Sequence, residues 1–403
     1  MNELETKIRD EITRKGPLPF ARYMALALYH PTLGYYSGGG QGREPVGWAG
    51  DYITSGDLHP LWGWCIARQL QQMWELLGCP RDFDVIEMGA GRGLLAREVW
   101  RYALTRAPQL AAALRYTLVD RATGTALHTA RAARLASALA DLGAPTGAVR
   151  WSEMLPATPA IGCVVANELV DALPVHVVEA REGTLRELFV TVDPASGQLA
   201  EVASNPSSPE VASYLDSFHV PWRTYPDGWR AEICLAAAPW MRQVAASLAR
   251  GFALTLDYGD TARRLYTPER WRGTLAVYRQ HHFDDRALLQ PGRQDITAHV
   301  NFSALMQNGR GAGLHLAGLT TQAAFLLGLG IRDELEALAA DRYPFADSER
   351  HTDRGQAAYL RRASLRNAVA ILLDPRGLGG FRVLVQQRGV PGAGKRLLGL
   401  RRA

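Results

Sequence analysis

The chain has 403 residues, of which 47% are hydrophobic and 21% are charged. These proportions match soluble globular proteins and exclude a wholly disordered chain, and the length suffices for one large domain or two ordinary ones. The stretch 386–403 holds five of the 45 basic residues and no acid, so the other 385 residues carry 40 basic and 40 acidic groups. We therefore expect no nucleic-acid-binding face. We expect residues 386–403 to be a disordered basic tail, with binding of an anionic partner as the alternative.

The sequence lacks features that would insert the chain into a membrane or direct it to another compartment. No run of about 18 apolar residues occurs, and residues 1–16 mix acids with bases around no apolar segment. The cysteines at 65, 79, 163 and 234 are scattered without a CxxC pair, which favours a reduced compartment and no zinc site. We expect a cytoplasmic protein without membrane insertion.

Residues 1–80 are expected to form a mostly helical cap region. Apolar residues three and four positions apart predict an amphipathic helix over 61–77, and a Gly-rich stretch interrupts the helical pattern at 37–50. From 81 to 385, short apolar segments alternate with helical ones, which predicts an α/β domain with a parallel sheet. The expected strands are 84–88, 115–120, 148–152, 162–166 and 252–257, and the expected helices include 94–105 and 126–142.

The alternation fails between the fourth and fifth of these strands. Residues 175–203 have the pattern of hairpin strands, with turns at Glu182-Gly183 and Ser196-Gly197. Residues 204–230 are rich in Pro and Ser and are expected to be loop. We interpret 175–230 as a β-rich insertion into the α/β domain.

Glycines at alternate positions follow the first expected strand. The dinucleotide pattern Gly-x-Gly-x-x-Gly fails, because the sixth position counted from Gly89 is Leu94. Acid-x-Gly-x-Gly-x-Gly is instead typical of the S-adenosylmethionine (SAM) loop of class I methyltransferases, where a ligand approaches backbone that has no Cβ. Glu87, Gly89, Gly91 and Gly93 are therefore candidate cofactor-binding residues, and a plain tight turn is the structural alternative.

Two other strand ends carry polar side chains where doubly wound sheets bind ligands. Asp120 ends the second strand and can accept hydrogen bonds from both ribose hydroxyls of SAM. Asn167, Glu168 and Asp171 follow the fourth strand and are the candidate catalytic residues. Paired carboxylates suit a cationic acceptor such as a guanidinium, which they orient by bidentate contact. The alternative is that Glu168 and Asp171 only cap a helix N-terminus.

From about residue 16 to 331 the chain resembles the MidA family, which includes a mitochondrial complex I assembly factor that acts as a protein arginine methyltransferase. The sequence departs from the family at Gly56-Asp57, where Pro-Glu is usual, and at Ala90 and Asp120, where Pro and Glu are common. The similar segments are Leu28 to Pro31, Gly34 to Tyr36, Gly50 to Ser55, Glu87 to Gly93, Ala166 to Pro174, Leu256 to Gly259, Pro291-Gly292, Asp295 to Phe302, and Thr321 to Leu326.

The resemblance implies a Rossmann-like class I methyltransferase sheet with a helical N-terminal region and an inserted β-rich substrate element. It implies SAM as cofactor and methylation of an arginine nitrogen on a protein substrate, such as a respiratory-complex subunit. Asp51 and Thr54 would lie over the cofactor or acceptor, unless their block is an ordinary turn with an Asp cap. Asp257 and Tyr258 would form a cleft wall, with simple packing equally weighted.

The same features are compatible with two other functions. A small-molecule N- or O-methyltransferase is one rival, and an assembly factor that binds SAM without catalysis is the other. We expect no metal site, because the adjacent His281 and His282 would point to opposite faces of a strand. His299 is either an acid–base group or a structural histidine. The oligomeric state is not assigned.

Overall fold

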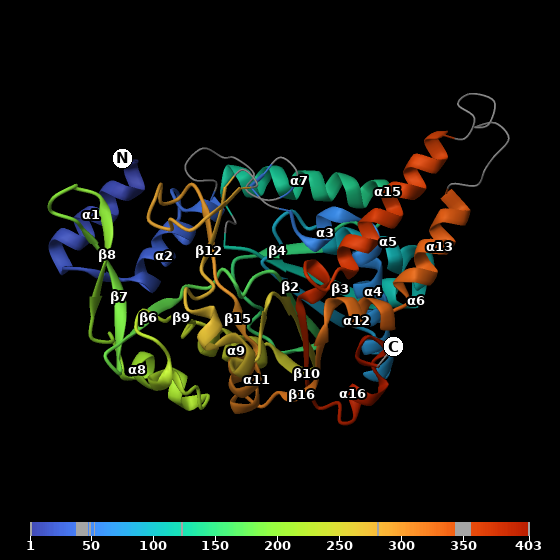
Figure 1. Ribbon diagram of the computed structural model, residues 1–403. Coiled ribbons are helices and arrows are strands. Elements are labelled where there is room, and N and C mark those ends of the chain that lie inside the picture. The colour runs from blue at the N-terminus through green and yellow to red at the C-terminus, as the bar shows by residue number, and fades with distance from the viewer. Residues whose placement is uncertain are drawn as a thin grey trace.

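The computed structural model describes residues 2–37, 47, 50–51, 53–121, 124–279, 282–342 and 356–401. Its described part is an α/β protein with mixed sheets, as the alternating pattern predicts (Figure 1). His281, named above as a weak metal-site candidate, lies outside the described residues.

Within the described residues, the largest sheet has seven strands in the order β16-β17-β10-β5-β2-β3-β4. All of its strands run parallel except β17, which is antiparallel to both of its neighbours. The five expected strands each fall on one of these elements. In sheet order, the bounds are β16 His315–Thr321, β17 Arg382–Arg388, β10 Leu248–Asp257, β5 Ala160–Asn167, β2 Phe83–Met88, β3 Leu114–Val119 and β4 Val149–Ser152.

Helices cover both faces of this sheet, and alternate residues of its strands supply the two cores. In β5, Val165 packs in the core with α4 (Pro60–Leu76), α5 (Leu94–Arg106) and α12 (Gln322–Gly328). Val164 faces the other side, toward α9 (Ala237–Ala246) and α11 (Phe302–Gly311). Because the inner strands β2, β3, β5 and β10 are buried on both faces, they appear in the sequence as largely apolar runs. The other helices and 3-10 turns are α3 Ser55–Leu58, α6 Pro108–Ala113, α7 Ala126–Asp141, α10 Ala262–Leu265, α13 Ile331–Arg342, α15 Gln356–Leu373, η1 Tyr35–Ser37, η3 Pro268–Arg270, η4 Leu378–Gly380 and η5 Leu398–Leu400.

A second, antiparallel sheet contains the predicted hairpins and forms what we call the N-terminal lobe, residues 2–29 and 176–233. Its strands follow the order β1-β7-β6-β9, with β8 paired to β7. The expectation that 204–230 is only loop is wrong, because a helix, α8 (Pro209–Ser217), forms there. Ser208 caps this helix, Pro209 starts it, and Val211 and Leu215 bury its apolar side. The strands are β1 Leu18–Pro19, β6 His176–Arg181, β7 Thr184–Val192, β8 Leu199–Ser204 and β9 Arg230–Ile233, and a 3-10 turn, η2, spans Trp222–Thr224.

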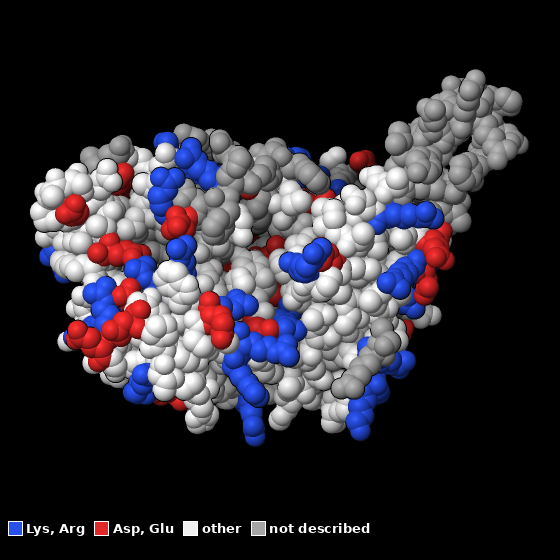
Figure 2. Space-filling model, in the orientation of Figure 1, with Lys and Arg blue, Asp and Glu red and all other residues white. Residues whose placement is uncertain are grey.

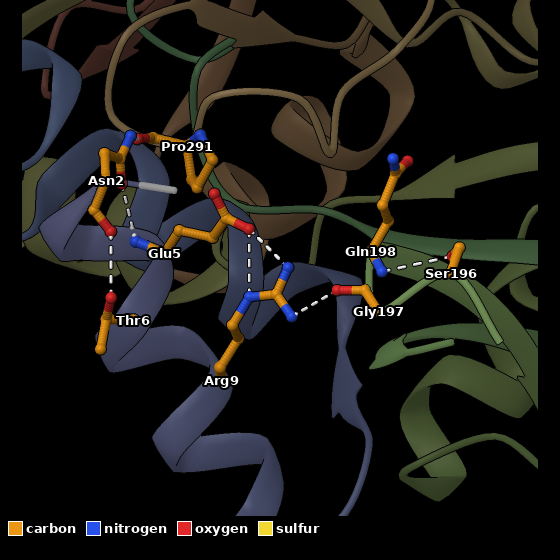
Figure 3. Close-up of polar contacts among 8 residues, drawn as sticks. All are labelled: Asn2, Glu5, Thr6, Arg9, Ser196, Gly197, Gln198 and Pro291. Carbon is orange, nitrogen blue, oxygen red and sulfur yellow. Dashed lines mark hydrogen bonds and ion pairs between the residues drawn. The ribbon is translucent and has the colours of Figure 1, made fainter. Parts of the chain in front are cut away.

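The first two helices, α1 (Glu3–Lys15) and α2 (Phe20–Tyr29), pack on this second sheet, whereas α4 packs on the large one. Figure 3 shows how α1 is tied down. The Asn2 side chain accepts from the Glu5 amide at 2.8 Å and donates to the Pro291 carbonyl at 2.9 Å. Arg9 donates to the carbonyl of Gly197, in the β7–β8 turn, at 2.6 Å. The helical N-terminal segment is thus shared between two cores.

The expectation of a disordered tail at 386–403 is wrong for residues 386–401. Strand β17 lies between β10 and β16, and Val385 and Gln386 are buried in it. Beyond it, α16 (Ala393–Arg396) and η5 follow, with Val390 and Leu397 buried. The charge count overlooked these apolar residues, whose burial stabilises the segment.

Short strands connect the lobe to the large sheet near the ends of β5 and β10. One small sheet has the order β13-β12-β14, and a second pairs β11 with β15. Residues 295–301 run through both of them. The bounds are β11 Gly259–Asp260, β12 Ala276–Arg279, β13 His282–Asp284, β14 Asp295–Thr297 and β15 Val300–Asn301.

Candidate active site

The glycine loop joins β2 to α5, and its three glycines differ in their surroundings. All have positive φ, at 69° for Gly89, 53° for Gly91 and 69° for Gly93. A Cβ on Gly89 would lie 2.8 Å from Leu169, and one on Gly93 would lie 2.4 Å from Leu135. Among the described residues, a Cβ on Gly91 would meet nothing closer than 4.0 Å. Gly89 and Gly93 therefore allow close internal packing, and Gly91 presents an open backbone surface that a ligand can approach.

The acids predicted beside this loop have partners within the protein. Tyr116 donates its hydroxyl to Glu87 Oε2 at 2.7 Å, and burial raises the pKa of Glu87 to about 8. Asp120 follows β3, and its Oδ2 lies 3.7 Å from Arg131 Nη1 on α7. The described contacts of Glu87 are internal, whereas Asp120 stands at the strand end next to the loop.

Asn167 and Glu168 lie at the carboxyl end of β5, in an irregular turn. Glu168 has φ of 48°, and its Oε1 accepts from the Ser55 amide at 3.0 Å and from Asn167 Nδ2 at 3.3 Å. Burial raises the pKa of Glu168 to about 7. Asn167 Oδ1 is buried and has no hydrogen-bond partner among the residues that the structure describes. No helix forms in the fully described stretch between β5 and β6, so the alternative of helix capping by Glu168 and Asp171 fails.

Asp171 lies in the same turn and faces Tyr258. The Tyr258 hydroxyl donates to Asp171 Oδ2, while Asp171 Oδ1 is buried and finds no partner in the described part of the chain. Burial raises the pKa of Asp171 to about 6. Asp257 is fully buried at the end of β10 and accepts from the amides of Val170 at 2.9 Å and Asp171 at 3.2 Å. Asp257 therefore shapes the turn, and Tyr258 contacts the candidate residue directly.

The segment Asp51–Thr54 leads into α3, and α3 contacts both the glycine loop and Glu168. Thr54 begins this helix with a capping box, its amide and hydroxyl each donating to Asp57 Oδ2 at 2.9 Å. Asp57 also forms an ion pair with Arg92 of the glycine loop. Asp51 is buried and accepts from the Tyr35 hydroxyl at 3.1 Å. Thr54 thus has the structural role of a cap, and the helix it starts connects the glycine loop with Glu168.

Sequence reasoning assigned no role to Asp295 or Tyr36, which the fold brings to this site. Tyr36 donates its hydroxyl to Asp295 Oδ1 at 2.9 Å. Burial, then the charge of Asp171, raises the pKa of Asp295 to about 8. The available signal was an acid in a segment, 295–302, that is similar to the MidA family.

Four carboxylates of the site lack an ion pair with Lys or Arg among the described residues, namely Glu168, Asp171, Asp257 and Asp295. Figure 2 shows a hollow near the middle of one face, with acidic atoms inside it. Burying carboxylates without a cation is costly, so the site is suited to a positively charged ligand. Because the sulfonium of SAM is a cation, the open Gly91 surface, Asp120 and the unpartnered acceptors fit this cofactor.

His299 has a neutral ring, because burial lowers its pKa to about 4. The ring packs edge-on against Tyr258 at 5.4 Å between centroids. Among the described residues, no three His, Cys, Asp or Glu side chains are grouped as metal ligands. No helix in the described part is long and apolar enough to cross a membrane.

Comparison with known proteins supports the cofactor. A Burkholderia thailandensis protein, crystallised with bound S-adenosyl-homocysteine, is 32% identical with a TM-score of 0.83, over 99% of this chain and 95% of that one. A second structure from that species is 31% identical with a TM-score of 0.79, over 99% and 94% of the two chains.

Curated relatives add names from animals. The Drosophila melanogaster relative, "Protein arginine methyltransferase NDUFAF7 homolog, mitochondrial", is 28% identical over 85% of this chain and 78% of its own. The human "Protein arginine methyltransferase NDUFAF7, mitochondrial" is 27% identical over 81% and 73%. These names contradict the expected cytoplasmic localisation, because they place the animal relatives in mitochondria. A charged N-terminal segment was therefore insufficient to assign a compartment.

A protein-family sequence model matches residues 65–320, which is more than half of the chain. It covers the glycine loop, Asp120, the turn after β5 and Asp295. The chain belongs to the family described as "Putative S-adenosyl-L-methionine-dependent methyltransferase", and SAM is its cofactor.

Proposed function

We propose that this protein methylates an arginine side-chain nitrogen of a protein substrate. The observation that carries the proposal is the set of four buried carboxylates without a protein cation. SAM brings a net charge of only about +1, so its binding leaves carboxylates available to a second cation. A guanidinium stays protonated at neutral pH and presents five N–H donors in one plane. The animal relatives named as protein arginine methyltransferases support the same acceptor.

The sheet order supports a Rossmann-like class I methyltransferase arrangement. In that arrangement the ligands bind at the carboxyl ends of the parallel strands. The ends of β2, β3, β5 and β10 carry the glycine loop, Asp120, the Glu168 turn and Asp257 respectively. In this proposal, Gly89, Gly91, Gly93 and Asp120 hold the cofactor, Glu87 supports the loop from within, and Asp51 and Thr54 position the covering segment.

The chain's residues would orient the acceptor and remove one proton. SAM, when bound, supplies the electrophilic methyl group. Asn167 Oδ1 and Asp171 Oδ1 accept N–H groups of the guanidinium and fix its plane. Glu168 takes the proton that the methylated nitrogen loses, a role that its pKa of about 7 suits near neutral pH. Alignment and charge complementarity would supply most of the rate enhancement.

The test is product analysis after incubating the purified protein with methyl-labelled SAM and a cell lysate. We expect label in protein, released on hydrolysis as methylarginine. Label confined to small molecules would favour the rival small-molecule methyltransferase. SAM binding without any transfer would favour the non-catalytic assembly factor. A respiratory-complex subunit as substrate stays a prediction.

A further inference from the structure

We infer that Asp295 is a specificity-determining residue that binds the acceptor's cationic side chain together with Asp171. The inference rests on the proposed function and deepens it. It adds a carboxylate from outside the β5 turn and predicts preference for a planar guanidinium over a lysine ammonium.

The backbone places Asp295 beside the turn that carries Asp171. The amide of Ala298, three residues after Asp295, donates to the Asp171 carbonyl at 3.0 Å. On the other side, the Tyr29 hydroxyl donates to the carbonyl of Ala172 at 2.9 Å. The segment that carries Asp295 and the turn that carries Asp171 are therefore neighbours, joined by the Ala298–Asp171 backbone hydrogen bond.

The two carboxylates influence one another and have no cation between them. Asp295 is 2% exposed and Asp171 is 6% exposed. Negative charge on Asp171 raises the pKa of Asp295, and neither residue forms an ion pair within the described chain. Asp171 Oδ1 also has no hydrogen-bond partner. A ligand that carries positive charge and donates N–H groups would supply both the missing ion pair and the missing hydrogen bond to Asp171 Oδ1.

Glu232 is also a buried acid, but its surroundings differ from those of Asp295. Glu232 is 6% exposed, and its Oε2 accepts from the Thr274 amide at 2.9 Å and the Thr274 hydroxyl at 2.7 Å. Burial raises its pKa, but no neighbouring acid contributes. Glu232 is thus satisfied by the protein alone, and it provides a matched control for Asp295.

Aromatic rings beside Asp295 favour a flat cation. Tyr36, which donates to Asp295, stacks on Tyr29 with 5.5 Å between centroids and 26° between planes. Tyr35 meets Tyr36 edge-on at 5.1 Å. Tyr29 already stacks with one guanidinium, that of Arg121, which lies 5.3 Å from its ring centroid. A guanidinium can contact such an aromatic cluster and two carboxylates together, because it is planar and weakly hydrated. A lysine ammonium is compact and strongly hydrated, so it gains less from this arrangement.

The experiment is calorimetric titration of the full-length protein, saturated with S-adenosyl-homocysteine, using N-acetyl-arginine amide and N-acetyl-lysine amide as probes. We expect the arginine probe to bind at least 10-fold more tightly than the lysine probe. Asp295→Asn should weaken arginine binding at least 10-fold and leave S-adenosyl-homocysteine binding unchanged. Glu232→Gln should change neither affinity.

The outcomes separate the inference from the proposed function. Binding of the arginine probe by the unaltered protein and equally by Asp295→Asn would overturn the inference and leave the proposed function standing. Equal affinity for the arginine and lysine probes would overturn the predicted selectivity. No binding of either probe by the S-adenosyl-homocysteine complex would overturn the proposed function and the inference with it.

If Asp295→Asn does not fold, Tyr36→Phe provides the test. The groups facing Asp295 are Asp171, Asp51, Tyr29, Tyr36 and Tyr278. The Tyr36 hydrogen bond lowers the pKa of Asp295. Without that bond, the pH at which arginine binding is half-developed should move upward. An unchanged pH profile would overturn the inference, because a packing role for Tyr36 would not be tied to this ionisation.

Discussion

Gly91 is the residue at which backbone freedom and ligand access can be separated experimentally. Gly91→Ala places a Cβ at φ of 53° on the open side of the loop. We expect SAM affinity to fall at least 10-fold, because the Cβ occupies the surface that the cofactor approaches. The left-handed conformation should itself cost about 1–2 kcal/mol of stability. Titration with SAM measures the first effect, and thermal unfolding measures the second.

Gly147→Ala is the matched control for this change. Gly147 has φ of 77°, and a Cβ there meets nothing within 4 Å. It should lower stability by a similar amount without altering SAM affinity. Equal SAM binding by both variants would show that Gly91 only shapes the turn.

Glu168 gives the activity a predicted dependence on pH. Its pKa is raised to about 7 by burial, so the proton-accepting carboxylate is lost as pH falls below 7. We expect kcat to rise between pH 6 and 8 and then level. Glu168→Gln should lower kcat by about 10²–10⁴-fold, a range typical of a general base, and abolish this rise. A kcat that keeps the same pH profile in Glu168→Gln would exclude the residue as the base.

Among the elements, α3 is predicted to couple cofactor and acceptor binding. Asp57 completes the capping box that Thr54 begins and pairs with Arg92, and the Ser55 amide donates to Glu168. Asp57→Ala removes the cap and the ion pair, so we expect KM to rise for both SAM and acceptor. The lost capping-box hydrogen bonds to Asp57 should cost about 0.5–1.5 kcal/mol each. Steady-state kinetics and thermal unfolding measure the two effects.

Ser208→Ala is a control variant that removes a capping hydrogen bond from a helix in the N-terminal lobe. Ser208 caps α8 through a 3.3 Å bond from the Val211 amide. Its loss should lower stability and leave both KM values unchanged. If Asp57→Ala and Ser208→Ala have the same kinetics, α3 has no coupling role.

The elements also show which parts of the fold the sequence encodes locally. The inner parallel strands β2, β3, β5 and β10 were predictable because burial on both faces makes each an apolar run beside a helical segment. The edge strand β16, whose side chains are partly exposed, was not among the expected strands. Strand β17 was not, because its partners β10 and β16 precede it by many residues and its basic ends resemble a solvated tail. Asn167, Glu168 and Asp171 were predictable from their place after a strand. Asp295 meets them only through long-range packing, which local pattern does not reveal.

At the scale of the whole molecule, the buried acids predict that stability falls as pH rises. Glu87 and Asp295 have folded-state pKa values of about 8, and Glu168 of about 7, all above their ordinary values. The folded state therefore holds protons that the unfolded chain releases, and this stabilisation is lost as pH rises through the folded-state values. A carboxyl whose pKa is higher by one in the folded state than in the unfolded chain contributes about 1.4 kcal/mol. His299 has its pKa lowered to about 4, so it does not oppose the trend above pH 6.5.

We expect the thermal midpoint of the ligand-free protein to fall by about 2 °C or more between pH 6.5 and 8.0, measured by circular dichroism. The double variant Glu168→Gln/Asp295→Asn should show a shallower fall, because it removes two of the titrating groups and retains Glu87. Adding S-adenosyl-homocysteine and N-acetyl-arginine amide should also flatten the dependence, since a bound cation stabilises the ionised carboxylates. A midpoint that is constant or rises over this range would mean that the carboxylates are already ionised. That result would contradict the raised pKa values of Glu87, Glu168 and Asp295, and with them the pH dependence of kcat predicted from Glu168.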